Sequence, residues 1–217
     1  MQLKENGQKN LRQNRKNKRF VYLISPNKIK NEKFYYKLNQ VLSSKKVSFF
    51  QLRLKKESFK NKIFIGKKIR KICKKHQVKF LINDDPTIAK KLNADGCHLG
   101  QKDMNILKAR KILKNKIIGI TCHNSINLAK KAISDGANYL AFGAFYPSKT
   151  KKVKYKASLK ILSLAKKLTN IPIVTIGGIK DTNYKKLLLN KANFLAISGY
   201  IWNNKKLNPR EAISKLI

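Results

Sequence analysis

Eight short apolar segments alternate with lysine-rich segments along the chain, and this alternation constrains the fold more than any other feature. The lysine-rich segments carry apolar residues at helical spacing, most clearly at residues 59–76, 125–134, 158–168 and 184–189. The apolar segments read as strands that are buried on both faces, as parallel strands are. These predicted strands lie at residues 20–25, 47–52, 78–82, 96–99, 117–121, 139–145, 171–176 and 193–197.

Eight strand–helix units in about 200 residues predict a single-domain α/β protein, a (β/α)8 TIM barrel, over residues 20–217. The alternative is an open doubly wound sheet, which favours a glycine-rich turn after the first strand. Ser25, Pro26 and Asn27 stand there instead. Residues 1–19 hold seven basic residues and one acidic residue, so we expect a flexible basic arm.

The formal net charge is +41, from 51 Lys and Arg against 10 Asp and Glu. Nucleic-acid readers rely on arginine forks, but only seven of the basic residues are arginine. The lysines are spread over almost every predicted helix, which argues against nucleic acid as a partner. An RNA-associated basic protein remains an alternative. We expect the charge to attract anionic, phosphorylated small molecules.

The chain has no apolar run of about 18 residues and no apolar stretch behind its basic start. We therefore expect a cytoplasmic protein without a membrane partner, and the sequence leaves a homo-oligomer open.

Cys73, Cys97 and Cys122 are odd in number and show no CxxC spacing, so neither a disulfide frame nor a zinc site is predicted.

Four of the ten acidic residues fall in one short window, at Asp84, Asp85, Asp95 and Asp103. In a TIM barrel the active site lies at the C-terminal ends of the strands. Asp84 follows the third predicted strand and Asp103 the fourth, so both would lie on that rim. Magnesium is typically held by one or two carboxylates plus substrate phosphates. We predict that Asp84 and Asp103 hold Mg²⁺; a helix N-cap is the alternative for Asp103, while Asp85 is predicted to cap the helix opened by Pro86.

Polar side chains follow other strands. Gln51, Arg53 and Lys55 lie on one side of an extended segment that begins at the end of the second strand, where an arginine fork suits a diphosphate. A solvated strand end is the alternative. Asn83 follows the third strand, and Thr121 ends the fifth with a hydroxyl that could donate to phosphate.

Three loops are candidate phosphate sites. Residues 146–152 carry two hydroxyls and three lysines besides Tyr146, and could close over a phosphate; a solvated lysine run is the alternative. Gly177 and Gly178 follow the seventh strand, and Ser198 and Gly199 the eighth, where such barrels bind phosphate with backbone N–H groups. Two tight turns without a ligand are the alternative.

Two histidines lie near the same rim. His98 is interior to a strand, so we expect a buried, hydrogen-bonded residue without a catalytic role. His123 could be an acid–base group or a loop residue that makes hydrogen bonds.

These motifs, in this order, resemble those of the thiamine phosphate synthase family over nearly everything from Phe20 to the C-terminus. The motifs are QLRLK at 51–55, NDD at 83–85, GCHLGQ at 96–101 followed by Asp103, YPSKTK at 146–151 and IGGI at 176–179. The resemblance implies a (β/α)8 barrel that requires Mg²⁺ and joins hydroxymethylpyrimidine diphosphate to hydroxyethylthiazole phosphate, giving thiamine phosphate and diphosphate.

The resemblance also implies a role for each site residue. Asp84 and Asp103 hold the metal, and Arg53, Lys55, Thr121 and Lys151 serve catalysis. The pyrimidine diphosphate is bound by Gln51, Arg53, Lys55, Asn83, Thr121 and Lys151. The thiazole phosphate is bound by Ser148, Thr150, Gly178, Ile197 and Ser198.

Two residues depart from the family pattern, and a second function of the same fold is left open. Thr121 stands where serine is usual, which keeps the hydroxyl and adds a methyl group that could slow turnover, and Cys122 beside it is not the commonest choice. The nearest rival function is a thiazole tautomerase of the same fold, with His123 as the proton carrier. That enzyme would not need the metal and diphosphate residues.

Overall fold

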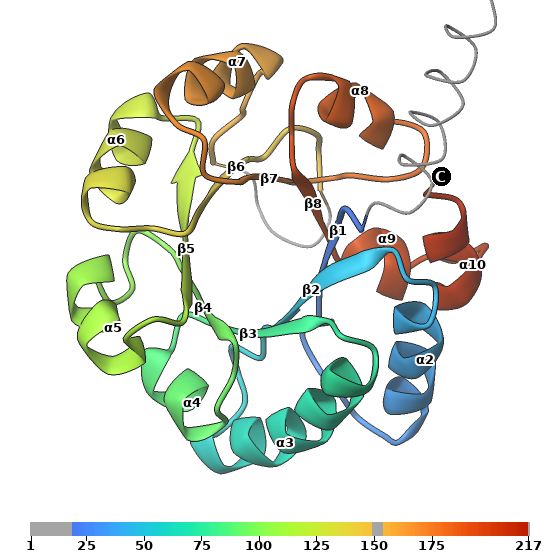
Figure 1. Cartoon of the computed structure of the whole chain (residues 1–217). Helices are drawn as coiled ribbons and strands as arrows, with labels where there is room; N and C mark the ends of the chain where they lie inside the picture. Colours follow the sequence, from blue (N-terminus) through green and yellow to red (C-terminus); the bar gives the residue numbers. More distant parts are fainter. Residues whose placement is uncertain (1–18, 149–153, 217) are drawn as a thin grey trace, which may run out of the picture.

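The computed structural model describes residues 19–148 and 154–216 and forms a closed barrel of eight strands surrounded by helices (Figure 1). Every strand pairs in parallel with the next along the chain, and β8 pairs with β1 to close the ring. The strands are β1 Val21–Ile24, β2 Val47–Leu52, β3 Lys79–Asn83, β4 Gly96–Leu99, β5 Ile117–His123, β6 Tyr139–Gly143, β7 Ile173–Ile176 and β8 Phe194–Ile197. The predicted single TIM barrel is therefore confirmed.

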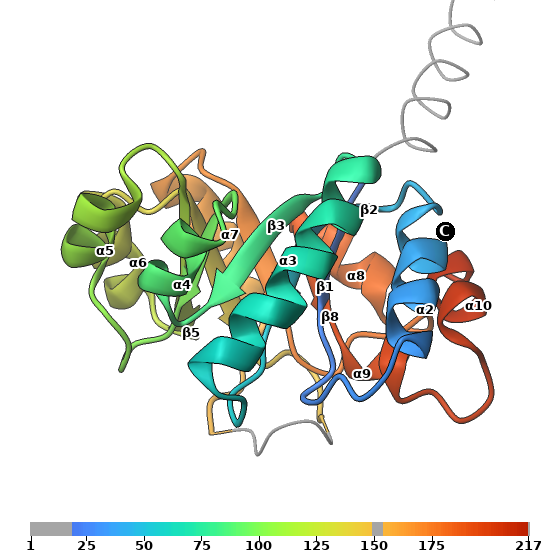
Figure 2. The same ribbon diagram turned by 90° about the horizontal axis from the view of Figure 1, so that it is seen from below.

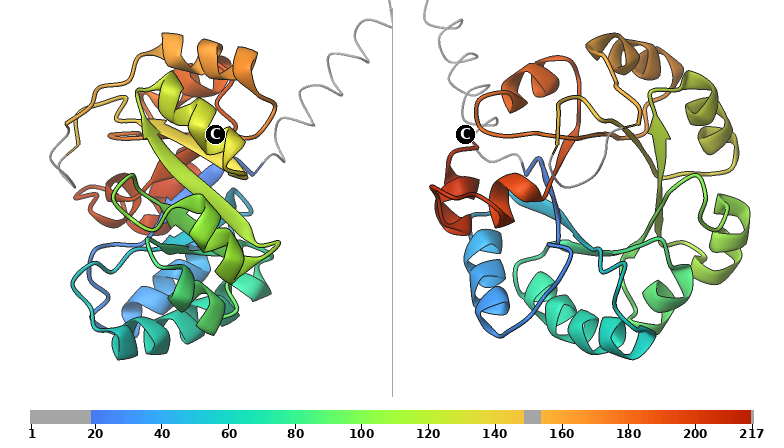
Figure 3. Two further views of the ribbon diagram at one scale, coloured as in Figure 1. Left: turned by 90° about the vertical axis from the view of Figure 1, so that its left-hand side faces the viewer. Right: turned by 180° about the vertical axis from the view of Figure 1, so that it is seen from behind.

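A ring of helices covers the outside of the barrel. In the described residues they are α2 Lys33–Leu42, α3 Phe59–Lys75, α4 Pro86–Lys91, α5 Ile106–Leu113, α6 Ile126–Ser134, α7 Leu159–Leu168, α8 Tyr184–Leu189, α9 Gly199–Trp202 and α10 Pro209–Ser214. Figure 2 shows α3 lying along the outside of the barrel beside β3, which it contacts. The first and last helices of this set, α2 and α10, lie side by side and complete the ring (Figure 3).

Three strand boundaries differ by two residues from those predicted. β5 runs on to His123, with an irregular register between Thr121 and His123 where it pairs with β6. β6 ends at Gly143, two residues early. β7 begins at Ile173 and not at 171, because Pro172 has no N–H to give to a strand ladder.

The core has two layers. The larger one lies between the strands and the helices, where apolar faces such as Leu38, Val41 and Leu42 of α2 are buried. The smaller one fills the barrel, which is a packed core and not a pore. Its buried members are Tyr22, Ile24, Leu81, Tyr139, Ala141, Val174 and Ala196.

Several loops begin helices with side-chain caps. The predicted cap Asp85 accepts a hydrogen bond from a backbone N–H of the first turn of α4 at 2.9 Å, and Ser125 does the same for α6 at 3.3 Å. Arg19, the last residue of the predicted arm, donates to the backbone of His76 and Gln77; residues 1–18 lie outside the described part. Within the described residues, no helix is long and apolar enough to span a membrane.

Candidate active site

Asp84 and Asp103 come together on the rim formed by the C-terminal ends of β3 and β4. Asp84 follows β3 with a left-handed backbone (φ 65°), and its N–H donates to the carbonyl of His98 at 2.8 Å. The Asp103 carboxylate accepts from the N–H of Gly100 at 2.7 Å. The pKa of Asp103 is raised, first by burial and then by a hydrogen bond with the Asp84 carboxyl group and by its charge. The two carboxyl groups are therefore direct neighbours.

The capping alternative for Asp103 is wrong. Helix α5 is capped by Asn105, whose side chain accepts from the Lys108 N–H at 2.9 Å. Asp103 stands two residues earlier and turns back to Gly100. A Cβ at residue 100 would lie 2.9 Å from the Asp103 Oδ2, so glycine at this position leaves room for the carboxylate. The loop thus holds Asp103 toward Asp84 and not toward the helix.

The end of β2 and the loop after it carry one amide and two basic side chains of the predicted site. The Lys55 Nζ lies 3.2 Å from the Asp84 Oδ2. The Arg53 guanidinium donates to the Asn27 Oδ1 at 2.9 Å, while its backbone N–H donates to the Ser25 hydroxyl. Gln51 points into the barrel and is 2% exposed. The structure thus places Arg53 and Lys55 at the rim, and Gln51 below them.

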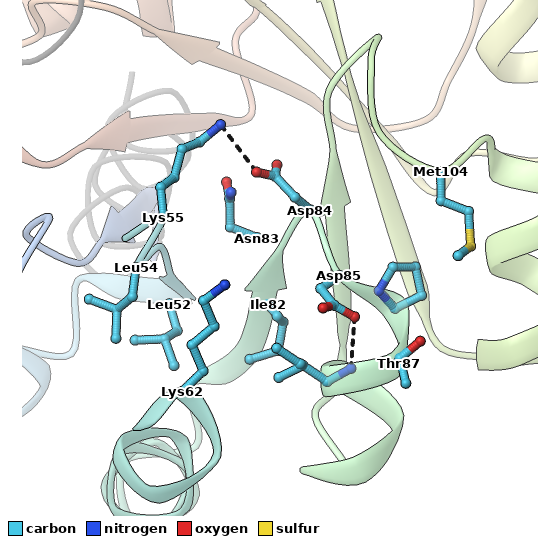
Figure 4. Close-up of a pocket in the computed structure, with 12 residues that line it drawn as sticks. Leu52, Leu54, Lys55, Lys62, Ile82, Asn83, Asp84, Asp85, Thr87 and Met104 are labelled. Carbon is cyan, nitrogen blue, oxygen red and sulfur yellow. Dashed lines mark hydrogen bonds and ion pairs between the residues drawn. The ribbon is translucent and has the colours of Figure 1, made fainter. Parts of the chain in front are cut away.

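A cavity of about 610 Å³ opens beside the acidic pair (Figure 4). Lys55, Asn83 and Asp84 line its polar part, and Leu52, Leu54, Ile82, Ile88 and Met104 are among its apolar lining residues. Lys62, which the sequence did not single out, points its ammonium group into this cavity from α3 (Figure 4). Among the described residues Lys62 forms no ion pair. The cavity therefore presents cationic groups from two elements.

The two histidines of the rim are placed differently. His98 is half-buried, with Nε2 2.9 Å from the Thr121 hydroxyl and Nδ1 2.8 Å from the Tyr139 hydroxyl. Burial is the main cause that lowers its pKa to about 4, so the ring is neutral at pH 7. The prediction of a satisfied interior histidine is confirmed. His123 ends β5, and its ring stacks on Tyr155 with 4.3 Å between ring centroids.

The turn after β7 packs against the loop after β6. Gly177 and Gly178 have φ values of 106° and 60°, which favour glycine. A Cβ on Gly178 would lie 2.2 Å from the Pro147 carbonyl oxygen, so the close approach also needs glycine. This brings Gly178 near the segment that carries Ser148. Thr150 and Lys151 lie outside the described residues.

The end of β8 adds a hydroxyl to the same rim. The Ser198 hydroxyl donates to the carbonyl of Ser25 at 3.1 Å and so joins β8 to the end of β1. The Ile197 side chain is 2% exposed and belongs to the layer between strands and helices. Only the main chain of Ile197 can therefore face a ligand in the barrel mouth.

Comparison with known families agrees with this arrangement. The family model described as thiamine monophosphate synthase matches residues 21–201. The chain belongs to the thiamine monophosphate synthase family. The match spans all eight strands, so the family resemblance drawn from the motifs is confirmed.

Relatives within the thiamine monophosphate synthase family cover nearly the whole chain. The thiamine-phosphate synthase of Pelagibacter ubique (strain HTCC1062) is 76% identical over 206 residues, which is 95% of this chain and 100% of the relative. The solved thiamine phosphate pyrophosphorylase of Pyrococcus furiosus superposes with a TM-score of 0.81 at 27% identity, covering 92% of this chain and 94% of that one. A solved 3-hexulose-6-phosphate synthase, with a TM-score of 0.63 at 17% identity over 90% of this chain and 98% of its own, shares the fold.

Proposed function

We propose that this chain is a transferase that forms thiamine phosphate by joining hydroxymethylpyrimidine diphosphate to hydroxyethylthiazole phosphate, with release of diphosphate. One observation carries the proposal. In a chain 76% identical to a thiamine-phosphate synthase, two adjacent carboxyl groups and a lysine lie on the barrel rim beside a cavity. Such a constellation suits a substrate that brings a diphosphate and a divalent cation.

The residues at the rim fit Mg²⁺. Carboxylate oxygens are hard metal ligands, as Mg²⁺ prefers. The negative charges of Asp84 and Asp103 repel each other unless a cation lies between them. In the described part of the chain, no three His, Cys, Asp or Glu side chains form a metal cluster. Two carboxylates would therefore hold the ion, and water and substrate phosphates would supply the other ligands. When bound, Mg²⁺ supplies neutralisation of the charge on the departing diphosphate.

The chain's own residues would bind and orient the pyrimidine diphosphate. Lys55 and Arg53 can offset phosphate charge from β2, and Asn83 can hold it from β3. Thr121 offers a hydroxyl from β5, and we include Lys151 on the resemblance alone. The carbon–oxygen bond to diphosphate breaks, the electron-rich aminopyrimidine stabilises the cation, and the thiazole nitrogen forms the new carbon–nitrogen bond. This sequence needs no general base.

The second substrate would bind between the ends of β6, β7 and β8. Backbone N–H groups at Gly178 and the main chain of Ile197 suit a phosphate, with hydroxyls from Ser148 and Ser198. Thr150 would complete this set on the resemblance. The pairing of two anionic substrates in one mouth lets the protein act by positioning and charge neutralisation.

The decisive assay incubates the protein with both substrates, with and without Mg²⁺, and measures thiamine phosphate. We expect product only with the metal, and its loss in Asp84→Asn and Asp103→Asn. A thiazole tautomerase would keep isomerising its substrate in both variants. An RNA-associated protein would bind RNA with steep salt dependence, also after Asp84→Asn, but less tightly once residues 1–19 are deleted. Product formed without metal, or no product, would refute the proposal.

A further inference from the structure

Five polar side chains form a continuous hydrogen-bonded chain across the inside of the barrel. The Gln51 amide nitrogen lies 3.0 Å from the Tyr22 hydroxyl, which lies 2.7 Å from the Tyr139 hydroxyl. The Tyr139 hydroxyl lies 2.8 Å from the His98 Nδ1, and the His98 Nε2 lies 2.9 Å from the Thr121 hydroxyl. The members come from β2, β1, β6, β4 and β5 in turn. This hydrogen-bonded series of side chains, called the polar chain below, thus ends at the hydroxyl of Thr121, which is predicted to bind the diphosphate.

This polar chain is built into the core. Gln51, Tyr22 and Tyr139 are only 2 to 3% exposed, so each polar group depends on a protein partner. A Cβ on Gly119 would lie 1.8 Å from the Tyr139 ring, so glycine there makes room for this ring inside the barrel. The burial and the space beside Gly119 hold the Tyr139 ring, and with it the hydroxyl, in a fixed position.

The direction of donation along the polar chain follows from proton counting. Tyr22 is buried, so its one hydroxyl proton needs a protein acceptor. The Gln51 NH2 group donates to Tyr22 and cannot accept, so Tyr22 gives its proton to Tyr139. Tyr139 then donates to the His98 Nδ1. A neutral imidazole carries one N–H, which must therefore be on Nε2 and donate to Thr121. The opposite direction requires the Gln51 carbonyl to face Tyr22.

We propose that this polar chain fixes the Thr121 hydroxyl as a hydrogen-bond donor toward a phosphate oxygen of the substrate, with Tyr139 and His98 as positioning residues. The proposal rests on the proposed function, because it takes the Thr121 ligand to be a diphosphate. Phosphate oxygens accept hydrogen bonds, so they need a donor at this point. With Thr121 already accepting from His98, its own proton is left for the ligand. The reverse direction would turn a lone pair toward the phosphate.

The tautomer of His98 can be tested without any substrate. The protein has three histidines, so its ¹⁵N-labelled imidazole signals are few. The two signals that disappear in His98→Gln are those of His98. We expect His98 at pH 7 to be protonated on Nε2 and bare on Nδ1, and Tyr139→Phe to raise the Nδ1–H form. Protonation on Nδ1 in the wild-type protein would overturn the proposal, even if the enzyme makes thiamine phosphate. Failure to make product would instead refute the proposed function and leave this result standing.

Kinetics then test whether the polar chain acts through Thr121. We expect Thr121→Val and Tyr139→Phe each to lower kcat/KM for the pyrimidine diphosphate roughly tenfold, as for loss of a hydrogen bond to a charged group. The KM for the thiazole phosphate should not change. In the Thr121→Val background, Tyr139→Phe should change kcat/KM for the pyrimidine diphosphate by less than about twofold, because the Thr121 hydroxyl that Tyr139 positions is gone. Equal effects in both backgrounds would show that Tyr139 only packs the core, and would overturn the proposal.

Two further comparisons separate positioning from folding. Tyr184 is as buried as Tyr139 but lies on α8, so Tyr184→Phe measures the effect of losing a buried hydroxyl outside the polar chain. His98→Gln can place an amide N–H where Nε2 stands, whereas His98→Asn is too short to reach Thr121. We therefore expect the Gln variant to keep severalfold more activity than the Asn variant. Equal activity of the two variants would contradict the direction of donation.

Discussion

The ammonium group of Lys55 lies 3.2 Å from the carboxylate of Asp84, so a cation at the end of β2 pairs with an acid at the end of β3. The Lys55 side chain is 54% exposed, so this ion pair stabilises the fold by at most about 1 kcal/mol. Its arrangement agrees better with the proposed ligands, a diphosphate at the lysine and a metal ion at the carboxylate.

The first prediction concerns Asp84. We expect Asp84→Asn to lower kcat/KM at least about a hundredfold, because an electrostatic contribution to the transition state is lost. The Mg²⁺ concentration for half-maximal rate should rise as well, in a titration at fixed substrate concentrations. Asp85→Asn is the matched control, since it removes the neighbouring charge but keeps a capping side chain on α4. An unchanged Mg²⁺ titration in Asp84→Asn would contradict the assignment.

Gly100 offers a test that removes neither carboxylate. The Cβ of Gly100→Ala would lie 2.9 Å from the Asp103 Oδ2, and the Asp103 side chain can move away from it at little cost to folding. We expect the free energy of unfolding to change by less than about 1 kcal/mol. Activity should fall by up to about a hundredfold, since small displacements of a catalytic group are costly. Urea unfolding and the Mg²⁺ titration measure the two effects; full activity would show that the position of Asp103 is not critical.

The barrel and its acidic pair could be predicted from the sequence for one physical reason. Parallel strands buried on both faces appear as continuous apolar runs, and their C-terminal ends meet on one rim. The position of Asp84 and Asp103 just past two such runs was therefore enough to place them together.

Other parts of the site depend on contacts that no local pattern contains. Tyr22 and Tyr139 look like ordinary strand residues, and their meeting inside the barrel follows from the register of strands far apart in sequence. Lys62 is one lysine among 44, and only the placement of α3 directs it into the cavity. The extension of β5 to His123 depends on its irregular pairing with β6.

Gly178 gives the third prediction. An alanine there would have to adopt φ 60° and would place its Cβ 2.2 Å from the Pro147 carbonyl oxygen, so the two loops must separate. We expect a loss of about 1–3 kcal/mol in the free energy of unfolding. The KM for the thiazole phosphate should rise at least about tenfold, because the phosphate loses aligned backbone N–H groups.

Gly136 is the matched control for Gly178. It has φ 87°, but a Cβ there would meet no atom within 4 Å. Gly136→Ala should therefore lose stability through backbone strain alone, with both KM values unchanged. If the two variants behave alike in steady-state kinetics, the contact between the β7 turn and the Pro147 loop has no part in substrate binding.

The last prediction is a pH dependence of stability set by His98. Burial lowers its pKa from an ordinary 6.5 to about 4 in the folded protein. As the pH falls below 6.5 the unfolded chain takes up a proton that the folded chain refuses, so stability present above pH 6.5 is lost progressively down to about pH 4. The full loss in the free energy of unfolding is about 3 kcal/mol, since each pKa unit corresponds to about 1.4 kcal/mol.

His98→Gln isolates this contribution, because glutamine does not titrate while Asp103 and the other acids do so in both proteins. We expect the unfolding free energy of the wild-type protein, minus that of His98→Gln, to fall as the pH is lowered from 7 to 4. Urea unfolding at several pH values, without metal or substrates, measures this difference. A difference that stays constant over that range would mean that folding does not lower the pKa of His98.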